Sequence, residues 1–244
     1  MRAVVLLPTY DERDNIVPML EALRASAPDA DIVVIDDDSP DGTGALAEEA
    51  AGRLGSIVVM HRTGKLGLGS AYRAGFAQAD AGGYDAVVTM DCDFSHDPGV
   101  VPAMIRCLEA GADVAVGSRY VAGGGVVDWP LQRRLLSRWG NRYTALALRL
   151  DVRDCTSGFR AYRTPALRAA HPDATTAEGY AFLTEMLRRL RSSGASIVEV
   201  PITFRERRAG QSKMSGRIIV ESMSLVTRWG LADRWAAFTH RQRR

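Results

Sequence analysis

Two carboxylates separated by one residue follow an apolar run in the first half of the chain. Asp91 and Asp93 come directly after residues 86–90, a pattern typical of a buried strand. At the end of a strand both carboxylates can turn toward one cation, and Mg²⁺ or Mn²⁺ prefers such oxygen ligands. A cation held there could neutralise charge on a departing diphosphate. Taken alone, an Asp-x-Asp pair is a weak indication, because many such pairs are solvated turns.

A second acidic run, residues 36–38, follows another apolar segment. One of its carboxylates could accept hydrogen bonds from a ribose hydroxyl or a base, while Asp41 or Thr43 could cap the helix that follows. The glycines around Lys65 do not form a nucleotide triphosphatase loop, because that loop needs Ser or Thr directly after the lysine.

The elements that must position these groups alternate between strand and helix patterns. Strands are predicted at residues 3–7, 31–35, 57–60, 86–90 and 114–116, and helices at 13–25, 43–54, 69–80 and 98–110. Continuous apolar strands separated by helices predict a mainly parallel sheet covered on both faces. Ligands bind beyond the carboxyl ends of such strands, where the polar clusters at 9–12, 36–38 and 91–93 fall.

The second half of the chain is less regular. A helix is predicted at 130–150, a strand at 197–204, and one or two amphipathic helices at 216–238. Glu185 lies in a further helical pattern, where it could orient a sugar hydroxyl, lie on an ordinary helix surface or form a structural ion pair.

Charge is unevenly distributed along the 244 residues. Residues 1–120 hold 9 Lys and Arg against 19 Asp and Glu, whereas residues 121–244 hold 22 against 10. The acidic half suits a metal site, and the basic half suits phosphates or an anionic lipid surface. We find no nucleic-acid-binding module, and the acidic half would repel a nucleic-acid backbone, so we expect no nucleic-acid partner.

Composition indicates a globular protein of the cytoplasm. Hydrophobic residues make up 46% of the chain, no apolar run is long enough to span a bilayer, and no apolar signal region follows Met1. Cys92, Cys107 and Cys155 have neither paired nor metal-ligand spacing, so we expect reduced, buried thiols.

The order of the motifs carries more information than any one of them. Residues 8–16, 36–43, 64–72 and 91–98 together resemble inverting glycosyltransferases of the large family that contains the polysaccharide synthases. Residues 117–120, 156–162 and 201–213 narrow the similarity to dolichyl- or polyprenyl-phosphate mannose synthases. The resemblance implies a Rossmann-like GT-A fold at residues 1–215, followed by a C-terminal amphipathic helix and basic tail at 216–244.

That resemblance also implies the reaction. The donor would be GDP-mannose, the acceptor a polyprenyl monophosphate, the cofactor Mg²⁺ or Mn²⁺, and the displacement inverting. A phosphate monoester is already anionic at neutral pH, so it needs little deprotonation before it attacks the anomeric carbon. The harder task is to bring two anionic substrates together, which cations accomplish by positioning and charge neutralisation.

Site residues follow from the resemblance position by position. The metal ligands would be Asp91 and Asp93, which with Arg119 are the expected catalytic residues. The acceptor phosphate would be held by Arg119, Arg133 and Ser137. The nucleotide-sugar would contact Pro8, Tyr10, Glu12, Asp36, Asp38, Lys65, Asp91, Arg207 and Lys213. Position 95 is Ser where some relatives have a Gln ligand, which leaves the third protein ligand open.

Residues 130–150 and 216–238 combine Leu and Trp with flanking Arg, a composition that suits a bilayer interface. Packing on the protein's own core is the alternative for such helices. We expect peripheral association with the cytoplasmic face of a membrane, through these helices, through a separate membrane-anchoring protein, or both. Two other functions stay open: a glucosyltransferase of the same fold that uses UDP-glucose, and a non-catalytic nucleotide-sugar-binding module.

Overall fold

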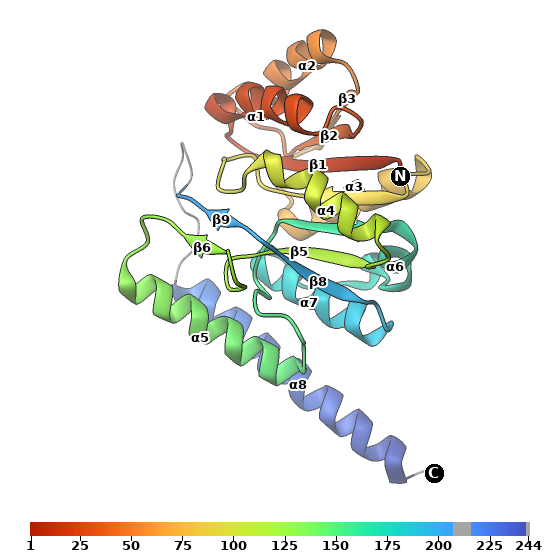
Figure 1. The fold of residues 1–244 in the computed structure, drawn as a ribbon, viewed down its shortest axis with the longest axis vertical. Helices are drawn as coiled ribbons and strands as arrows, with labels where there is room; N and C mark the ends of the chain where they lie inside the picture. Colours follow the sequence, from red (N-terminus) through yellow and green to blue (C-terminus); the bar gives the residue numbers. More distant parts are fainter. Residues whose placement is uncertain (207–215, 243–244) are drawn as a thin grey trace.

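The computed structural model describes residues 1–206 and 216–242, which form a seven-stranded sheet with helices on both faces (Figure 1). The strands lie in the order β3-β2-β1-β4-β7-β5-β8, and a separate two-stranded sheet pairs β6 with β9. The strands are β1 (Ala3–Thr9), β2 (Asp31–Asp36), β3 (Ile57–His61), β4 (Ala86–Thr89), β5 (Val114–Ser118), β6 (Gly125–Val126), β7 (Arg160–Arg163), β8 (Ile197–Pro201) and β9 (Thr203–Phe204).

Helices connect these strands. They are α1 (Arg13–Ser26), α2 (Thr43–Leu54), α3 (Leu68–Ala81), α4 (Val101–Glu109), α5 (Leu131–Leu148), α6 (Thr164–Ala169), α7 (Gly179–Ser192) and α8 (Gly216–Gln242), with short 3₁₀ turns at η1 (Pro98–Val100) and η2 (Pro172–Ala174). The helices predicted at 13–25, 43–54 and 69–80 are confirmed to within one residue at each end. The one predicted at 98–110 divides into η1 and α4, each with a proline in its first turn, where the missing N–H is tolerated.

The predicted parallel sheet of the first half is confirmed, because β1 pairs in parallel with β2 and β4, and β2 with β3. Successive residues of β1 face opposite sides of the sheet. Val5 and Leu7 pack with residues of α1, α2 and α4, whereas Val4 and Leu6 pack with residues of α3 and α7. Burial on both faces explains why β1 reads as an unbroken apolar run.

Strand β7 was not predicted. It lies between β4 and β5 and is antiparallel to both. The first and last of its four residues are arginines, so the segment lacks the apolar pattern that indicates a buried strand. Arg160 is fully buried, and its guanidinium donates to the carbonyl oxygens of Leu183 (2.6 Å) and Cys155 (2.9 Å). Backbone acceptors thus offset the cost of burying this charge.

The strand predicted at 197–204 is two strands that belong to different sheets. The chain leaves the main sheet at Ile202, whose N–H donates to the carbonyl of Ser118 (3.0 Å). β8 pairs with β5, whereas β9 pairs with β6. In this small second sheet, β6, the strand before α5, pairs with β9 beside the site described below.

Helices α5 and α8 lie side by side along one flank of the body (Figure 1). The Tyr143 hydroxyl hydrogen-bonds the Thr227 hydroxyl across them at 2.5 Å. Val226 of α8 is buried in the same cluster as side chains of α3 and α7, so this part of α8 packs on the main body. The C-terminal part of α8 extends beyond it (Figure 1). Within the described residues, no helix has the length and apolarity needed to cross a membrane.

Candidate active site

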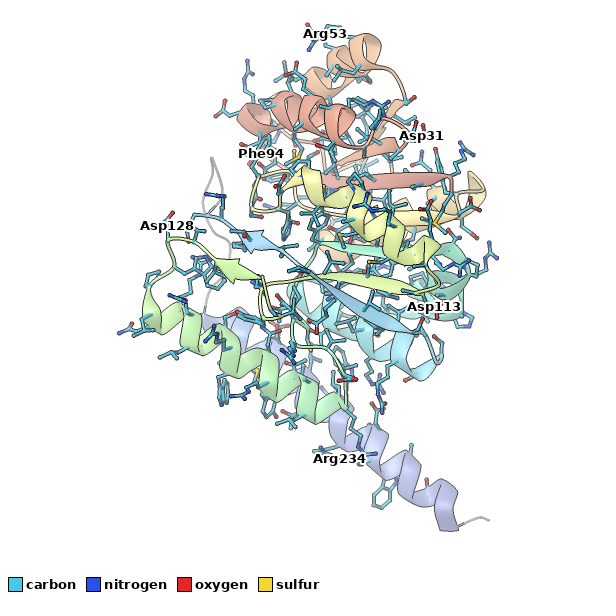
Figure 2. The ribbon with its side chains drawn as sticks, in the orientation of Figure 1. Asp31, Arg53, Phe94, Asp113, Asp128 and Arg234 are labelled. Atoms are coloured by element: carbon cyan, nitrogen blue, oxygen red, sulfur yellow. The ribbon has the colours of Figure 1, made fainter. Side chains whose placement is uncertain are left out.

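Two cavities open where the strands of the sheet have their carboxyl ends. In Figure 2 this end of the sheet is marked by the labelled residues Phe94, in the turn after β4, and Asp128, before α5. The labelled residues Asp31 and Asp113 mark the opposite end. The first cavity has a volume of about 660 Å³ and the second about 300 Å³. Their walls share Leu68, Asp91, Asp93 and Ser222. The two spaces therefore meet at the pair of carboxylates singled out in the sequence.

The turn after β4 directs Asp91 and Asp93 to this junction. Cys92, between them, instead packs in the core, and burial raises the pKa of its thiol well above the ordinary value. The Oδ1 atom of Asp93 accepts a hydrogen bond from the Ser95 N–H at 3.0 Å. Phe94 adopts a left-handed conformation (φ 59°), which reverses the chain there.

The donor set at the junction fits a hard divalent cation. It consists of carboxylate oxygens, with the buried hydroxyl of Ser95, which has no hydrogen-bond partner, also in the wall of the second cavity. Among the residues that the structure describes, no three His, Cys, Asp or Glu side chains cluster as a metal site. A cation held by Asp91 and Asp93 would therefore need further ligands from water or substrate phosphate, as Mg²⁺ commonly does.

The larger cavity contains most of the residues expected to contact a nucleotide-sugar. Pro8, Tyr10, Glu12 and Lys65 all lie in its wall. The Lys65 ammonium lies 3.8 Å from the centroid of the Tyr10 ring, a cation–π contact between the β1–α1 loop and the loop before α3. A cation and an aromatic ring are thus in contact in the wall of the larger cavity.

Asp36 and Asp38 are absent from that wall. Asp36 is buried, and its carboxylate accepts hydrogen bonds from the Thr9 hydroxyl (2.9 Å) and the Ser39 hydroxyl (2.6 Å), so it ties β2 to the end of β1. Asp38 is exposed on a left-handed turn (φ 58°). Neither residue is brought to the cavity by the fold.

Asp37 is the member of the acidic run that lines the larger cavity, and it was not among the expected site residues. Its Oδ1 accepts from Arg62 at 2.5 Å, and its Oδ2 accepts from the Leu66 N–H at 3.2 Å. Asp37 thereby holds the glycine-containing loop that carries Lys65. Sequence spacing could not separate it from its two acidic neighbours, because all three lie at the carboxyl end of the same strand.

The smaller cavity gathers the three residues expected to hold the acceptor phosphate: Arg119, Arg133 and Ser137. Arg133 donates to Glu206, and its guanidinium lies 4.1 Å from the Trp129 ring centroid. The Ser137 hydroxyl accepts a hydrogen bond from the Tyr120 hydroxyl at 2.6 Å.

The guanidinium of Arg119 points its paired nitrogens toward protein rather than toward open space. Its Nε donates to Asp154 Oδ2 (2.7 Å), and its Nη2 donates to Asp154 Oδ1 (2.6 Å) and to the Thr156 hydroxyl (2.7 Å). The guanidinium of Arg119, which the resemblance assigned to the acceptor phosphate, is thus directed at a buried carboxylate. Burial raises the pKa of Asp154, but Arg119 outweighs it, and the net pKa is lowered.

His96 lies in the wall of the smaller cavity behind Asp93. Its ring packs against Phe159 and Phe204, with centroid distances of 5.1 Å and 5.5 Å. Burial lowers the pKa of His96 to about 4. The ring is therefore neutral at pH 7.

Glu185 forms the structural ion pair that was one of its expected roles. Its Oε2 accepts from the N–H groups of Thr176 (3.0 Å) and Ala177 (2.9 Å), and its Oε1 pairs with Arg189 (3.1 Å). The side chain is buried and lines neither cavity. Arg207 and Lys213, two expected contacts of the nucleotide-sugar, lie outside the described residues.

An apolar surface on α5 and α8 adjoins the smaller cavity, and we call it the interface face. Its side chains are highly exposed: Leu131 (67%), Leu135 (57%), Leu136 (49%), Trp139 (57%), Leu146 (75%), Val220 (70%), Leu231 (59%) and Trp235 (71%). Leu136 and Trp139 also line the cavity, so its apolar wall continues onto this surface.

Comparison with known proteins shows the family of this chain. The family model for Glycosyl transferase family 2 matches residues 4–170. The undecaprenyl-phosphate mannosyltransferase of Micrococcus luteus is 46% identical over 235 residues, which cover 96% of each chain. The polyprenol monophosphomannose synthase of Mycolicibacterium smegmatis is 45% identical, with 96% of this chain and 88% of that protein covered.

A more distant relative and a solved structure extend the comparison. The dolichol-phosphate mannosyltransferase of Pyrococcus furiosus is 36% identical over 98% of this chain and 68% of that protein. Glucosyl-3-phosphoglycerate synthase from Mycobacterium tuberculosis, solved with Mn²⁺, UDP and phosphoglyceric acid, superposes with a TM-score of 0.66 at 21% identity, over 96% of this chain and 78% of that one. At that identity the likeness shows the shared GT-A fold.

Proposed function

This chain belongs to glycosyl transferase family 2 and is a glycosyltransferase, and we propose that it transfers mannose from GDP-mannose to a polyprenyl monophosphate with inversion. One observation carries the proposal: two cavities with different linings meet at Asp91 and Asp93. The relatives named above are mannosyltransferases and synthases of polyprenyl-type phosphates, which supports mannose transfer to such an acceptor.

The larger cavity would hold the donor, with Tyr10 and Lys65 beside the nucleotide and its diphosphate directed toward Asp91 and Asp93. Asp91 and Asp93 would hold a divalent cation, which when bound would offset the charge that develops on the departing diphosphate. The structural neighbour bound Mn²⁺ with UDP, which supports a divalent metal in this fold without choosing between Mg²⁺ and Mn²⁺.

The smaller cavity would hold the acceptor phosphate next to Arg133 and Ser137, with Arg119 behind them. An oxygen of the phosphate monoester attacks the anomeric carbon of the sugar, and the bond from that carbon to the diphosphate oxygen breaks. The nucleoside diphosphate leaves with the bonding electrons, and the product is a phosphodiester. No proton has to be removed from the acceptor, which agrees with a site where His96 is buried and Glu185 is engaged by backbone N–H groups.

The interface face supports a peripheral position on a membrane, where the acceptor's isoprenoid chain resides. Exposed Trp and Leu side chains lie beside the arginines of α5, the composition that favours a bilayer interface. We propose that this face rests on the cytoplasmic leaflet, alone or with a membrane-anchoring protein. The smaller cavity would then open toward the lipid.

The test is incubation of the purified protein with radiolabelled GDP-mannose, Mg²⁺ or Mn²⁺ and polyprenyl phosphate, followed by organic extraction. We expect label in the lipid phase that is lost when metal or acceptor is omitted. Label transferred from UDP-glucose but not from GDP-mannose would identify UDP-glucose as the donor and leave the class of reaction unchanged. No transfer from either donor, with membranes and detergent supplied, would contradict the proposed reaction.

A further inference from the structure

Arg119 and Arg133, both in the described wall of the smaller cavity, each pair with a carboxylate, but the two pairs differ in exposure to solvent. The Arg119 and Asp154 side chains are 8% and 0% exposed, whereas those of Arg133 and Glu206 are 35% and 51% exposed. Breaking the first pair would leave a buried charge without a partner. The second pair is open to water and is therefore easily separated.

The fold holds Glu206 beside the cavity. Its segment continues from β9, where the Val127 N–H donates to the Phe204 carbonyl at 2.9 Å. The Arg205 N–H then donates to the Ser95 carbonyl at 3.2 Å, which fastens the segment to the turn that carries Asp93. Both Glu206 and Arg133 lie in the cavity wall. The ion pair thus forms where the proposed acceptor phosphate would bind.

We propose that Glu206 is an internal counter-ion that competes with the acceptor phosphate for Arg133 and promotes release of the product. This inference rests on the proposed function. A phosphate monoester carries up to two negative charges, and Arg133 can donate two parallel hydrogen bonds to it. The incoming phosphate therefore displaces one carboxylate, and Trp129 keeps the guanidinium in place during the exchange.

The reaction itself removes the charge advantage of the phosphate over Glu206. Once the phosphate oxygen has bonded to the sugar, the phosphate is a diester with one negative charge, the same charge as a carboxylate. Glu206 is still held nearby by β9 and Ser95, so it competes at high effective concentration. Arg133 returns to Glu206, and the product loses its ionic contact with Arg133.

The experiment measures equilibrium binding of polyprenyl phosphate and of its mannosylated product to the protein in detergent micelles, without donor. Glu206→Gln, Arg133→Gln and the double variant complete a double-mutant cycle. We expect Glu206→Gln to tighten binding of both lipids by about two- to fivefold, the range for a partly exposed pair. In the Arg133→Gln background the same change should have no effect, and the KM for GDP-mannose should not move.

Asp128→Asn is the matched control. It removes one negative charge from the exposed loop before α5, and asparagine tolerates the left-handed conformation at this position (φ 60°). We expect this variant to bind both lipids as the wild type does. An equal effect of Asp128→Asn and Glu206→Gln, or an equal effect of Glu206→Gln in both backgrounds, would reduce the result to general electrostatics and overturn the proposal.

Two further outcomes separate this inference from the proposed function. Unchanged or weaker lipid binding by Glu206→Gln, in a protein that transfers mannose normally, would refute the counter-ion role and leave the function intact. A wild-type protein that neither binds polyprenyl phosphate nor transfers mannose would refute both.

Discussion

Arg119 and Asp154 form a buried ion pair joined by three hydrogen bonds. The Arg119 side chain contributes two, Nε to Oδ2 at 2.7 Å and Nη2 to Oδ1 at 2.6 Å, and its backbone N–H adds a third to Oδ2 at 3.0 Å. The backbone N–H of Asp154 in turn donates to Glu199 at 3.0 Å. The pair therefore connects the end of β5 to the loop before β7 and to β8, and Arg119 lies in the wall of the smaller cavity.

Asp154→Asn should destabilise the fold, because it leaves the Arg119 charge buried without a carboxylate. We expect a loss of about 3–5 kcal/mol in unfolding free energy, measured by urea denaturation. Glu21→Gln, which removes an exposed partner of Arg53, serves as the control and should change stability little. Equal losses of unfolding free energy in the two variants would show that the charge of Asp154 does not stabilise the fold.

Asp93→Asn should reduce mannosyl transfer by at least about 100-fold, because it removes a proposed ligand of the cation that offsets diphosphate charge. Calorimetric titration of GDP in the presence and absence of Mn²⁺ should show that the metal no longer strengthens nucleotide binding. Asp97→Asn is the control, since that exposed carboxylate only accepts from the Gly99 N–H at the start of η1. Full activity of Asp93→Asn with either metal would exclude the ligand role.

His96 should make the protein lose stability as the solution becomes acidic. Its pKa lies at about 4 in the folded protein against 6.5 ordinarily, so only the unfolded state takes up a proton between these values. The contribution is complete above pH 6.5 and is lost as pH falls toward 4, by about 3 kcal/mol in total. His96→Gln should flatten the dependence of unfolding free energy on pH over this interval, whereas the wild-type protein should show the full slope.

Gly230→Ala should separate α8 from α5. An added Cβ would lie 2.6 Å from the carbonyl oxygen of Ala147, closer than real contacts allow. We expect a lower melting temperature and a higher KM for both the lipid acceptor and GDP-mannose, because α5 and α8 line the smaller cavity and α8 also lines the larger one. Gly52→Ala, within α2, has nothing within 4 Å of the new Cβ and should stabilise the protein slightly. A Gly230→Ala variant with wild-type stability would contradict this close helix contact.

Leu146→Glu combined with Trp235→Glu should weaken sedimentation with vesicles of anionic lipid, because a charge replaces apolar surface at a proposed bilayer interface. The two side chains are 75% and 71% exposed, so melting temperature should hardly change. Val58→Glu, on the edge strand β3, is the control for an exposed apolar residue away from the interface face (52% exposed). Vesicle binding that persists at the wild-type level would show that this face does not mediate it.

Local sequence was sufficient for the elements with strong periodicity. The strands through Val5, Val33 and Val88 and the helices between them were predictable, because residues buried on both faces of a sheet must be apolar in sequence. β7 was not predictable, since the fully buried Arg160 donates to the carbonyl oxygens of Leu183, in α7, and of Cys155, in the loop before β7. Ile202, where the chain leaves one sheet for another, carries no local signal either.

For the site, the chain by itself determined the chemical inventory: paired carboxylates at a strand end, an acidic run after β2 and the arginines of the basic half. Only the tertiary structure decided which members of that inventory face the cavities. Asp37 lines the larger cavity while Asp36 is buried against Thr9, and Arg119 pairs with Asp154 while Arg133 pairs with the exposed Glu206. Side-chain direction and burial depend on partners tens of residues away in sequence, and no spacing rule within one segment contains that information.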